Sequence, residues 1–263
     1  MSSYSTIQLE RDGAVAKLTL DRPESANALS LAMSQELMHA AIDLDEDQTV
    51  RAVLLTGNGK MFCAGGDLGA MKEEGDRASA YIKEMAGNLH MAISRFARMR
   101  APVVTAVNGT AAGAGFSMVC ATDLAIASET AKFTMAYTGA GLSPDGSSSY
   151  FLPRIIGARR TAELMLTNRV LNSADALEWG LVNQVVPAEE LLPTAEKLVD
   201  QLASGATASF AVVKRLLLNS ANDSLESQME HETRGIADSA RTDDGREGIA
   251  AFLDKRRPKF TGN

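Results

Sequence analysis

A turn of small residues is the feature of this sequence that points most directly to chemistry. It lies within residues 102–123, where an apolar run ending at Val107 is followed by Gly113-Ala114-Gly115 and by a second apolar run. A strand, a small-residue turn and a helix in this order leave free backbone N–H groups at the helix N-terminus, where negative charge is stabilised. The turn has neither the lysine of a phosphate-binding P-loop nor the glycine spacing of a dinucleotide site. The segment therefore predicts either a tight packing turn or one half of an oxyanion hole.

A second turn of the same kind lies upstream. Residues 53–56 form an apolar run that leads into MFCAGGDL, residues 61–68, which again places small residues before an amphipathic stretch. Each turn can offer one N–H to the same carbonyl oxygen, and two converging donors are what an oxyanion hole requires. The pair of turns favours a site that stabilises an oxygen as it becomes negative.

The elements that must hold these turns alternate between strands and helices. Apolar runs and period-two alternation predict strands, whereas apolar residues three to four positions apart predict helices. Asp12-Gly13 is typical of a hairpin turn between the first two strands. The alternation as a whole predicts an α/β architecture. Strands are expected at residues 7–10, 15–20, 50–56, 103–107, 124–127 and 132–135, and helices at residues 31–44 and 78–99.

Beyond about Ala158 the pattern becomes almost wholly helical. The final residues, 252–260, have the composition of a basic, partly aromatic tail. No linker rich in Pro, Gly or Ser divides the chain, so we expect an α/β core over residues 1–200 and an attached helical segment over residues 201–263. In this part we expect a short strand at residues 182–186 and helices at residues 159–167, 174–180, 189–203, 208–219 and 225–239.

Composition narrows the classes of partner and site. The 263 residues carry a formal net charge of -7, which argues against nucleic acid as the main partner, because phosphate binding needs a basic surface. Two isolated cysteines predict a reducing cytoplasm and no disulfide framework. There is no recognisable leader, and no apolar run is long enough to span a bilayer. Three histidines without a Cys/His cluster lead us to expect no metal site.

The two turns and the segments around them resemble the crotonases, also called the enoyl-CoA hydratase/isomerase superfamily. The resemblance covers nearly the whole chain, and it implies a spiral of ββα units with a helical C-terminal segment that mediates trimers or paired trimers. The matching pieces, in order, are DRP at residues 21–23, NAL at 27–29, FCAGGDL at 62–68, residues 102–123, residues 141–157, ALEWGLV at 176–182, REG at 246–248, then Phe252, Lys255 and Arg256.

The resemblance implies where a thioester would bind. The two oxyanion donors fall on the backbone N–H groups of Gly66 and Ala114, where they would stabilise a thioester enolate. The implied substrate is an acyl-CoA, and no separate cofactor is implied because CoA is part of the substrate. Arg22 and Lys255 have an equally ordinary interpretation as solvated surface charges. The residues expected near CoA are Arg22, Ala26, Ala28, Ala64, Asp67, Leu68, Phe252 and Lys255, the last two from the same or a neighbouring subunit.

The acids expected of a hydratase are missing. Hydratases of this family hold a water between two glutamates, and the corresponding positions are Ser117 and Tyr137. Asp145 remains, in the turn SPDG, and its position resembles that of the single acid of the isomerase branch and of the nucleophile of the 4-chlorobenzoyl-CoA dehalogenase branch. A single carboxylate suits a double-bond shift, because it takes a proton from one carbon and returns it to another.

Three further side chains are expected around the acyl group. Tyr137 stands where the dehalogenase branch has a tryptophan that grips the nucleophile, and Ser117 either faces the pocket or bonds back to its own helix. His90 matches the general base of that branch in position, but we interpret it first as a pocket-lining or helix-packing residue. Aromatic residues that would enclose a benzoyl ring are few, with only Tyr81 and Phe96 in residues 78–99.

The sequence therefore predicts a cytoplasmic enoyl-CoA isomerase of the crotonase fold with Asp145 as its acid and base. The first alternative is an enoyl-CoA hydratase with Asp145 as its only acid, and the second is an aryl-CoA dehalogenase. The third, from a different class, is a catalytically idle acyl-CoA-binding scaffold.

Overall fold

The computed structural model describes residues 4–263 and contains two sheets, of which the larger has six strands. The expected hairpin is confirmed, since β1 and β2 pair antiparallel around Asp12 and Gly13. The other neighbours are parallel, and β3 and β5 in the middle are buried along their whole length. Continuous apolar runs of this kind are typical of strands covered on both faces. The strand order is β1 (Ile7–Asp12), β2 (Val15–Leu20), β3 (Ala52–Gly57), β5 (Val103–Val107), β7 (Leu124–Ser128), β10 (Gln184–Val186).

The smaller sheet has four very short strands. β4, β6 and β8 run parallel, and β9 pairs antiparallel with β8. β4, β6 and β8 each follow a strand of the larger sheet after a tight turn, and β9 follows a helix. The chain therefore passes repeatedly from one sheet to the other. β4, β6 and β9 were not predicted from the sequence, because two or three residues are too few to show an alternation of apolar and polar side chains. The strands are β4 (Met61–Cys63), β6 (Thr110–Ala112), β8 (Lys132–Thr134) and β9 (Leu171–Asn172).

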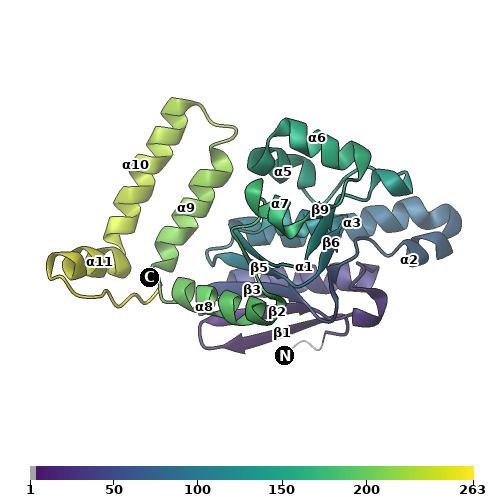
Figure 1. The fold of residues 1–263 in the computed structure, drawn as a ribbon. Coiled ribbons are helices and arrows are strands. Elements are labelled where there is room, and N and C mark those ends of the chain that lie inside the picture. The colour runs from purple at the N-terminus through teal and green to yellow at the C-terminus, as the bar shows by residue number, and fades with distance from the viewer. Residues whose placement is uncertain (1–3) are drawn as a thin grey trace.

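Helices cover both faces of the larger sheet (Figure 1). α1 and α3 pack against each other on one face, and the apolar side of α8 packs on the other, over β3 and β5. Ser30 caps α1 by accepting a hydrogen bond from the Met33 N–H. The helices of this part are α1 (Leu31–Glu46), α2 (Leu68–Glu73), α3 (Ala78–Arg98), α4 (Ala114–Ala121), α5 (Ser148–Ile156), α6 (Ala158–Thr167), α7 (Ser173–Glu178) and α8 (Leu191–Ala203), with 3-10 turns at Pro23–Ser25, Gly75–Arg77, Thr138–Ala140 and Ala188–Glu190.

The last three helices stand apart from the sheets as an arm (Figure 1). They are α9 (Thr207–Asn219), α10 (Leu225–Arg241) and α11 (Asp243–Leu253). Lys214 of α9 fastens the arm to the core, because its buried ammonium donates to the Phe96 and Ala101 carbonyls and to Asp123. The end of the chain folds back on α11, where the buried Asp244 carboxylate accepts from the N–H groups of residues 261 and 262.

The expected α/β architecture is confirmed, with two corrections to the expected elements. The helical part begins at Ser148, not near Ala158, because Pro153 and the serines before it obscured α5. Phe252 belongs to α11, which the sequence analysis missed, so the basic tail begins only after Leu253. Among the described residues, no helix combines the length and apolar character needed to cross a membrane.

Candidate active site

The two small-residue turns meet in space. β4 and β6 are hydrogen-bonded neighbours, so the turns that follow them leave the sheet side by side. The contact is close, because a Cβ atom on Gly65 would lie 3.5 Å from the Gly113 Cα and 3.1 Å from the Ala112 carbonyl oxygen. Gly65 and Gly113 also have φ values of +98° and +49°, which side chains with a Cβ rarely adopt. Backbone geometry thus favours glycine at both positions, and at Gly65 packing does so as well.

The backbone orients the Gly66 N–H away from its neighbouring strand. Leu29 pairs with Gly66 in a parallel bridge, in which the Leu29 N–H donates to the Gly65 carbonyl and the Asp67 N–H donates to the Leu29 carbonyl. In such a bridge the middle residue's own N–H points to the opposite side. The Gly66 N–H is therefore directed away from Leu29, and Gly66 lines the cavity described below.

Ala114 supplies the second donor as the first residue of α4. The first N–H groups of a helix have no intrahelical acceptor, and they lie at the positive end of the helix dipole. The start of α4 is fixed by Gly115, at which a Cβ would lie 2.5 Å from the Cys63 carbonyl oxygen. Only glycine lets α4 begin this close to β4. Gly66 and Ala114, the two donors expected from the sequence, line the same cavity.

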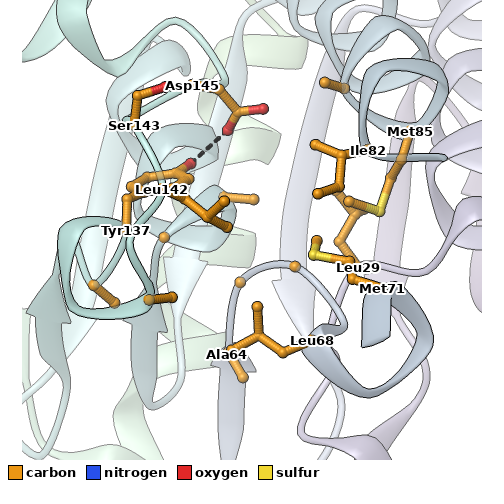
Figure 2. A pocket seen from close by; sticks show the side chains of 17 residues that line it. Leu29, Ala64, Leu68, Met71, Ile82, Met85, Tyr137, Leu142, Ser143 and Asp145 are labelled. Carbon is orange, nitrogen blue, oxygen red and sulfur yellow. Dashed lines mark hydrogen bonds between the residues drawn. The ribbon is translucent and has the colours of Figure 1, made fainter. Parts of the chain in front are cut away.

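A cavity of about 250 Å³ lies above these donors. Figure 2 shows Tyr137, Leu142 and Asp145 on one wall and Ile82 and Met85 on the opposite wall. Asp145 is the only carboxylate among the described residues that line the cavity. The full lining is Leu29, Ala64, Gly65, Gly66, Leu68, Met71, Ile82, Met85, Ala86, Gly113, Ala114, Ala136, Tyr137, Ala140, Leu142, Ser143 and Asp145.

Asp145 is held by Tyr137. The Tyr137 hydroxyl donates to Asp145 Oδ1 over 2.7 Å, as the dashed line in Figure 2 shows. Burial, together with the nearby Asp145 charge, raises the pKa of Tyr137 well above its usual value, so the phenol remains a proton donor at all physiological pH values. This bond fixes the rotamer of a carboxyl group that otherwise faces apolar side chains.

Ser117 lies behind Asp145 and does not line the cavity. Its side chain is completely buried, with Oγ 3.0 Å from the Tyr137 hydroxyl and 2.9 Å from the Asp145 carbonyl oxygen. The Gly113 carbonyl, one turn earlier in the helix, is a third neighbour at 3.1 Å. Ser117 thus ties the Asp145 loop to α4: the expected bond to its own helix is present, whereas the expected place in the pocket is not.

His90, on α3, lies on the far side of Asp145 from the cavity. Its Nε2 accepts a hydrogen bond from the Gly146 N–H and lies 3.8 Å from Asp145 Oδ2. Asp145 therefore has Tyr137 at one oxygen and His90 at the other. Of the three side chains expected around the acyl group, only Tyr137 lines the cavity.

The residues expected near CoA fall into two groups. Ala64 and Leu68 line the cavity, and Leu68 is exposed at its edge. The carbonyl of Ala26 accepts from the Ala64 N–H, and the carbonyl of Ala28 accepts from Arg22, so these turns are joined to each other.

Arg22 and Asp67 form an ion pair of 3.2 Å at this edge. Both groups are about one-fifth exposed, so neither is simply a solvated surface charge. The pair connects the turn that carries Ala28 to the turn that carries Gly66.

Phe252 and Lys255 lie on the arm and do not line the cavity of their own chain. Phe252 is 83% exposed. Their expected place near CoA stays a prediction that involves a neighbouring subunit.

Much of the apolar wall of the cavity was not predicted from the sequence. Met71 and Ile82 stand opposite Asp145, on α2 and α3, and Leu142 closes the same side as Tyr137. The helical period of residues 78–99 identifies the buried side of α3, but it does not separate the residues that face a cavity from those that fill the core. No signal in the sequence marks Met71, because α2 has only six residues.

Comparison with known proteins agrees with this geometry. The family described as enoyl-CoA hydratase/isomerase matches residues 10–263. The 1,2-epoxyphenylacetyl-CoA isomerase of Escherichia coli is 38% identical over 256 residues, 94% of this chain and 95% of that protein. A probable enoyl-CoA hydratase of Rhodobacter capsulatus is 38% identical over 260 residues, 99% of each chain.

A solved structure shows the same fold. The crystal structure of an enoyl-CoA hydratase/isomerase from Mycobacterium abscessus superimposes with a TM-score of 0.91 at 34% identity, covering 98% of this chain and all of the other. With the family match and the converging turns, this likeness establishes that the chain is an enzyme of the enoyl-CoA hydratase/isomerase family, the crotonase superfamily.

Proposed function

We propose that the protein is an enoyl-CoA isomerase that shifts a carbon–carbon double bond, with Asp145 as the group that moves the proton from one carbon to the other. The observation that carries this proposal is the composition of the cavity wall. One carboxylate, held by one phenol, faces apolar side chains above two backbone donors. Such a site has a place to hold one proton and no second carboxylate with which to activate water.

The proposed reaction begins with the thioester carbonyl oxygen between the N–H groups of Gly66 and Ala114. Asp145 takes a proton from the α-carbon of a 3-enoyl thioester, and the electron pair moves into a dienolate whose oxygen is stabilised by the two donors. The same carboxyl group then returns the proton to the γ-carbon, and the double bond moves to the 2,3 position. Tyr137 positions Asp145 throughout and keeps its own proton.

The apolar wall supports an aliphatic acyl group. Met71, Ile82, Met85 and Leu142 supply most of the surface, and Tyr137 is the only aromatic side chain in the described lining. Methionine adapts its shape to the ligand beside it. A flexible aliphatic chain therefore suits this wall better than a rigid aromatic ring, which counts against the aryl-CoA dehalogenase alternative.

The oligomer and the compartment belong to the same proposal. The arm carries exposed apolar side chains that a single chain leaves uncovered, among them Leu217, Leu225, Ile236, Phe252 and Leu253. Patches of this kind mark association surfaces. We propose that they join copies of the chain into trimers or paired trimers, in the cytoplasm.

The test compares two substrates and three proteins. We expect the wild-type protein to interconvert 3-enoyl-CoA and 2-enoyl-CoA without any gain in product mass, measured by absorbance and mass spectrometry. Asp145→Asn, which keeps the size of the side chain, should lower the rate at least about 100-fold, as expected for a positioned proton-transfer group. Leu142→Met, in the same wall, serves as the matched control and should retain most of the activity.

The alternatives give different results in these assays. A gain of 18 mass units that is lost in Asp145→Asn would support a hydratase with a single acid. Halide release from an aryl-CoA would support the dehalogenase, and CoA binding without turnover on a broad acyl-CoA panel would support the idle scaffold.

A further inference from the structure

Asp145 separates two cavities that differ in polarity. On one side lies the apolar cavity described above. On the other side lies a second cavity of about 570 Å³, which Asp145 also lines. The same carboxyl group is therefore open to two different environments, one on each side of the loop 143–147.

The second cavity is more polar than the first and is open enough for water. It is bounded by α3, by α5 and the loop 143–147 that precedes it, and by the end of α9. A polar space of this volume holds several water molecules, since one water needs only about 10–15 Å³ of such volume. Its polar lining includes His90, Ser94, Ser147, Ser149, Asn219 and Asn222.

The first cavity offers no comparable route for a proton. Its only titratable side chains in the described lining are Asp145 and Tyr137, and burial keeps Tyr137 protonated. An acyl chain that fills this cavity removes water from the side of Asp145 that faces it. A proton on the carboxyl group can then reach solvent from the side of the second cavity.

His90 stands at that side. Its Nε2 lies 3.8 Å from Asp145 Oδ2, and its side chain is half exposed, toward the second cavity. The Gly146 N–H donates to the same nitrogen, so Nε2 carries a lone pair and the ring proton sits on Nδ1. A lone pair beside a carboxyl group, with water behind it, is the arrangement that a proton exchange requires.

We propose that His90 and the second cavity form the route by which the proton held on Asp145 exchanges with solvent while substrate occupies the first cavity. The proton passes from Oδ2 to Nε2, which leaves a carboxylate and an imidazolium and releases the Gly146 N–H. A small rotation of the ring closes the 3.8 Å gap. The imidazolium N–H exchanges with cavity water, and a solvent proton returns by the same path. His90 acts through Asp145 and does not touch the acyl group.

This inference rests on the proposed role of Asp145 as acid and base. The experiment below gives one result if only the route through His90 is wrong and another if the role of Asp145 is wrong. The readout is deuterium in the acyl chain, measured by mass spectrometry during turnover of 3-enoyl-CoA in D₂O. In His90→Gln, the side-chain oxygen can still accept from the Gly146 N–H, but the side chain cannot carry a proton. His39→Gln, on α1 and away from both cavities, is the matched control.

We expect His90→Gln to keep the rate of the double-bond shift within about twofold, yet to lower deuterium incorporation per turnover by about 10-fold or more, because a positioned proton carrier contributes on the order of 10²- to 10⁴-fold to the transfer that it assists. His39→Gln should incorporate as much deuterium as the wild type. In His90→Ala, added imidazole should restore incorporation.

A second measurement covers the case in which no double bond moves. Exchange of the α-hydrogens of a saturated acyl-CoA with D₂O needs only the oxyanion hole and Asp145, so it reports on His90 without isomerisation. Equal exchange in wild type and His90→Gln, or no exchange in wild type, would overturn the inference. Absence of the double-bond shift with exchange that still depends on His90 would overturn the proposed isomerisation alone.

Discussion

The side chain of Ser117 and the backbone of Gly146 are packed so closely that neither residue can be enlarged. A Cβ atom on Gly146 would lie 2.8 Å from the Ser117 Cβ, and Gly146 has a φ of +59°. The space that a longer side chain at position 117 needs is thus occupied by the loop that carries Asp145. The packing that places Asp145 at the cavity therefore leaves no room for a glutamate at position 117.

Ser117→Glu should therefore fail to create a hydratase. The larger side chain overpacks the contact with Gly146 and buries a charge without a cation, so we expect the free energy of unfolding to fall by about 3 kcal/mol or more. Urea denaturation measures the stability, and the mass of the product measures water addition. Ser117→Ala is the control and should cost about 1 kcal/mol. A stable Ser117→Glu protein that adds water would contradict this packing argument.

Tyr137→Phe should slow the reaction while preserving substrate affinity. It removes the hydrogen bond to Asp145 Oδ1 but keeps the ring that lines the cavity. A hydrogen bond to a charged group contributes about 1.5–3 kcal/mol, so kcat should fall by about 10- to 100-fold. Steady-state kinetics measure kcat and KM separately. Tyr81→Phe, which affects a hydroxyl at the start of α1, is the control, and an unchanged kcat in Tyr137→Phe would show that Asp145 needs no such support.

Gly115→Ala should disturb the oxyanion hole through the backbone. The added Cβ would lie 2.5 Å from the Cys63 carbonyl oxygen, so α4 has to move away from β4 and carry the Ala114 N–H with it. We expect a loss of stability of about 1–3 kcal/mol, seen in thermal denaturation, and a loss of activity even well below the melting temperature. Gly87→Ala is the matched control, since nothing lies within 4 Å of its Cβ and the helix α3 should gain about 0.5–1 kcal/mol. Full activity in Gly115→Ala would argue against a donor at Ala114.

Both cysteines should be unreactive in the folded protein. Burial raises the pKa of the Cys63 thiol to about 11 and that of Cys120 further, so almost no thiolate exists at pH 8. A colorimetric thiol reagent should label neither residue in the native protein and both after denaturation. Rapid labelling of the native protein would mean that β4 or α4 opens readily.

The folded tail should depend on the charge of Glu247. Hydrogen bonds from Arg256, with the Lys259 N–H, lower the pKa of Glu247 to about 2 from an ordinary value of 4.5. Because the folded-state pKa is depressed, the contribution to stability is complete above about 4.5 and is lost as the pH falls through about 2. Carboxyl titration by NMR measures the midpoint. In Glu247→Gln the tail should be cut faster by protease at pH 7, and a midpoint near 4.5 in the wild type would refute the tail contact.

The sequence predicts the long elements well because they repeat a period many times. α3 and α1 lie within two residues of the expected ranges, and the central strands β5 and β7 match to within one residue. The three-residue strands β4 and β6 were not predicted, because tertiary pairing, not local preference, makes them strands. The turns that follow them were nevertheless identified from their small residues.

The sequence identifies those cavity residues whose type is required by the backbone conformation or by the proposed reaction. Gly66, Ala114 and Asp145 line one cavity, and they could be singled out because glycine turns and an isolated acid stand out in the sequence. His90 was expected around the acyl group but lies behind Asp145, because its place depends on how α3 packs against the loop 143–147. The place of Arg22 likewise depends on packing, since its partner Asp67 is 45 residues away.

The pairing of β4 with β6 has a consequence for how the site can be altered. Hydrogen-bonded strands lie about 4.8 Å apart whatever side chains they carry. The main chain, and not the side chains, therefore sets the separation of the Gly66 and Ala114 N–H groups, which follow these strands. Side chains across the cavity can be replaced, to suit another reaction or another acyl group, while the separation of the two N–H groups stays the same. A change that moves the main chain, such as a Cβ atom at Gly115, would alter this separation and with it every reaction that the site supports.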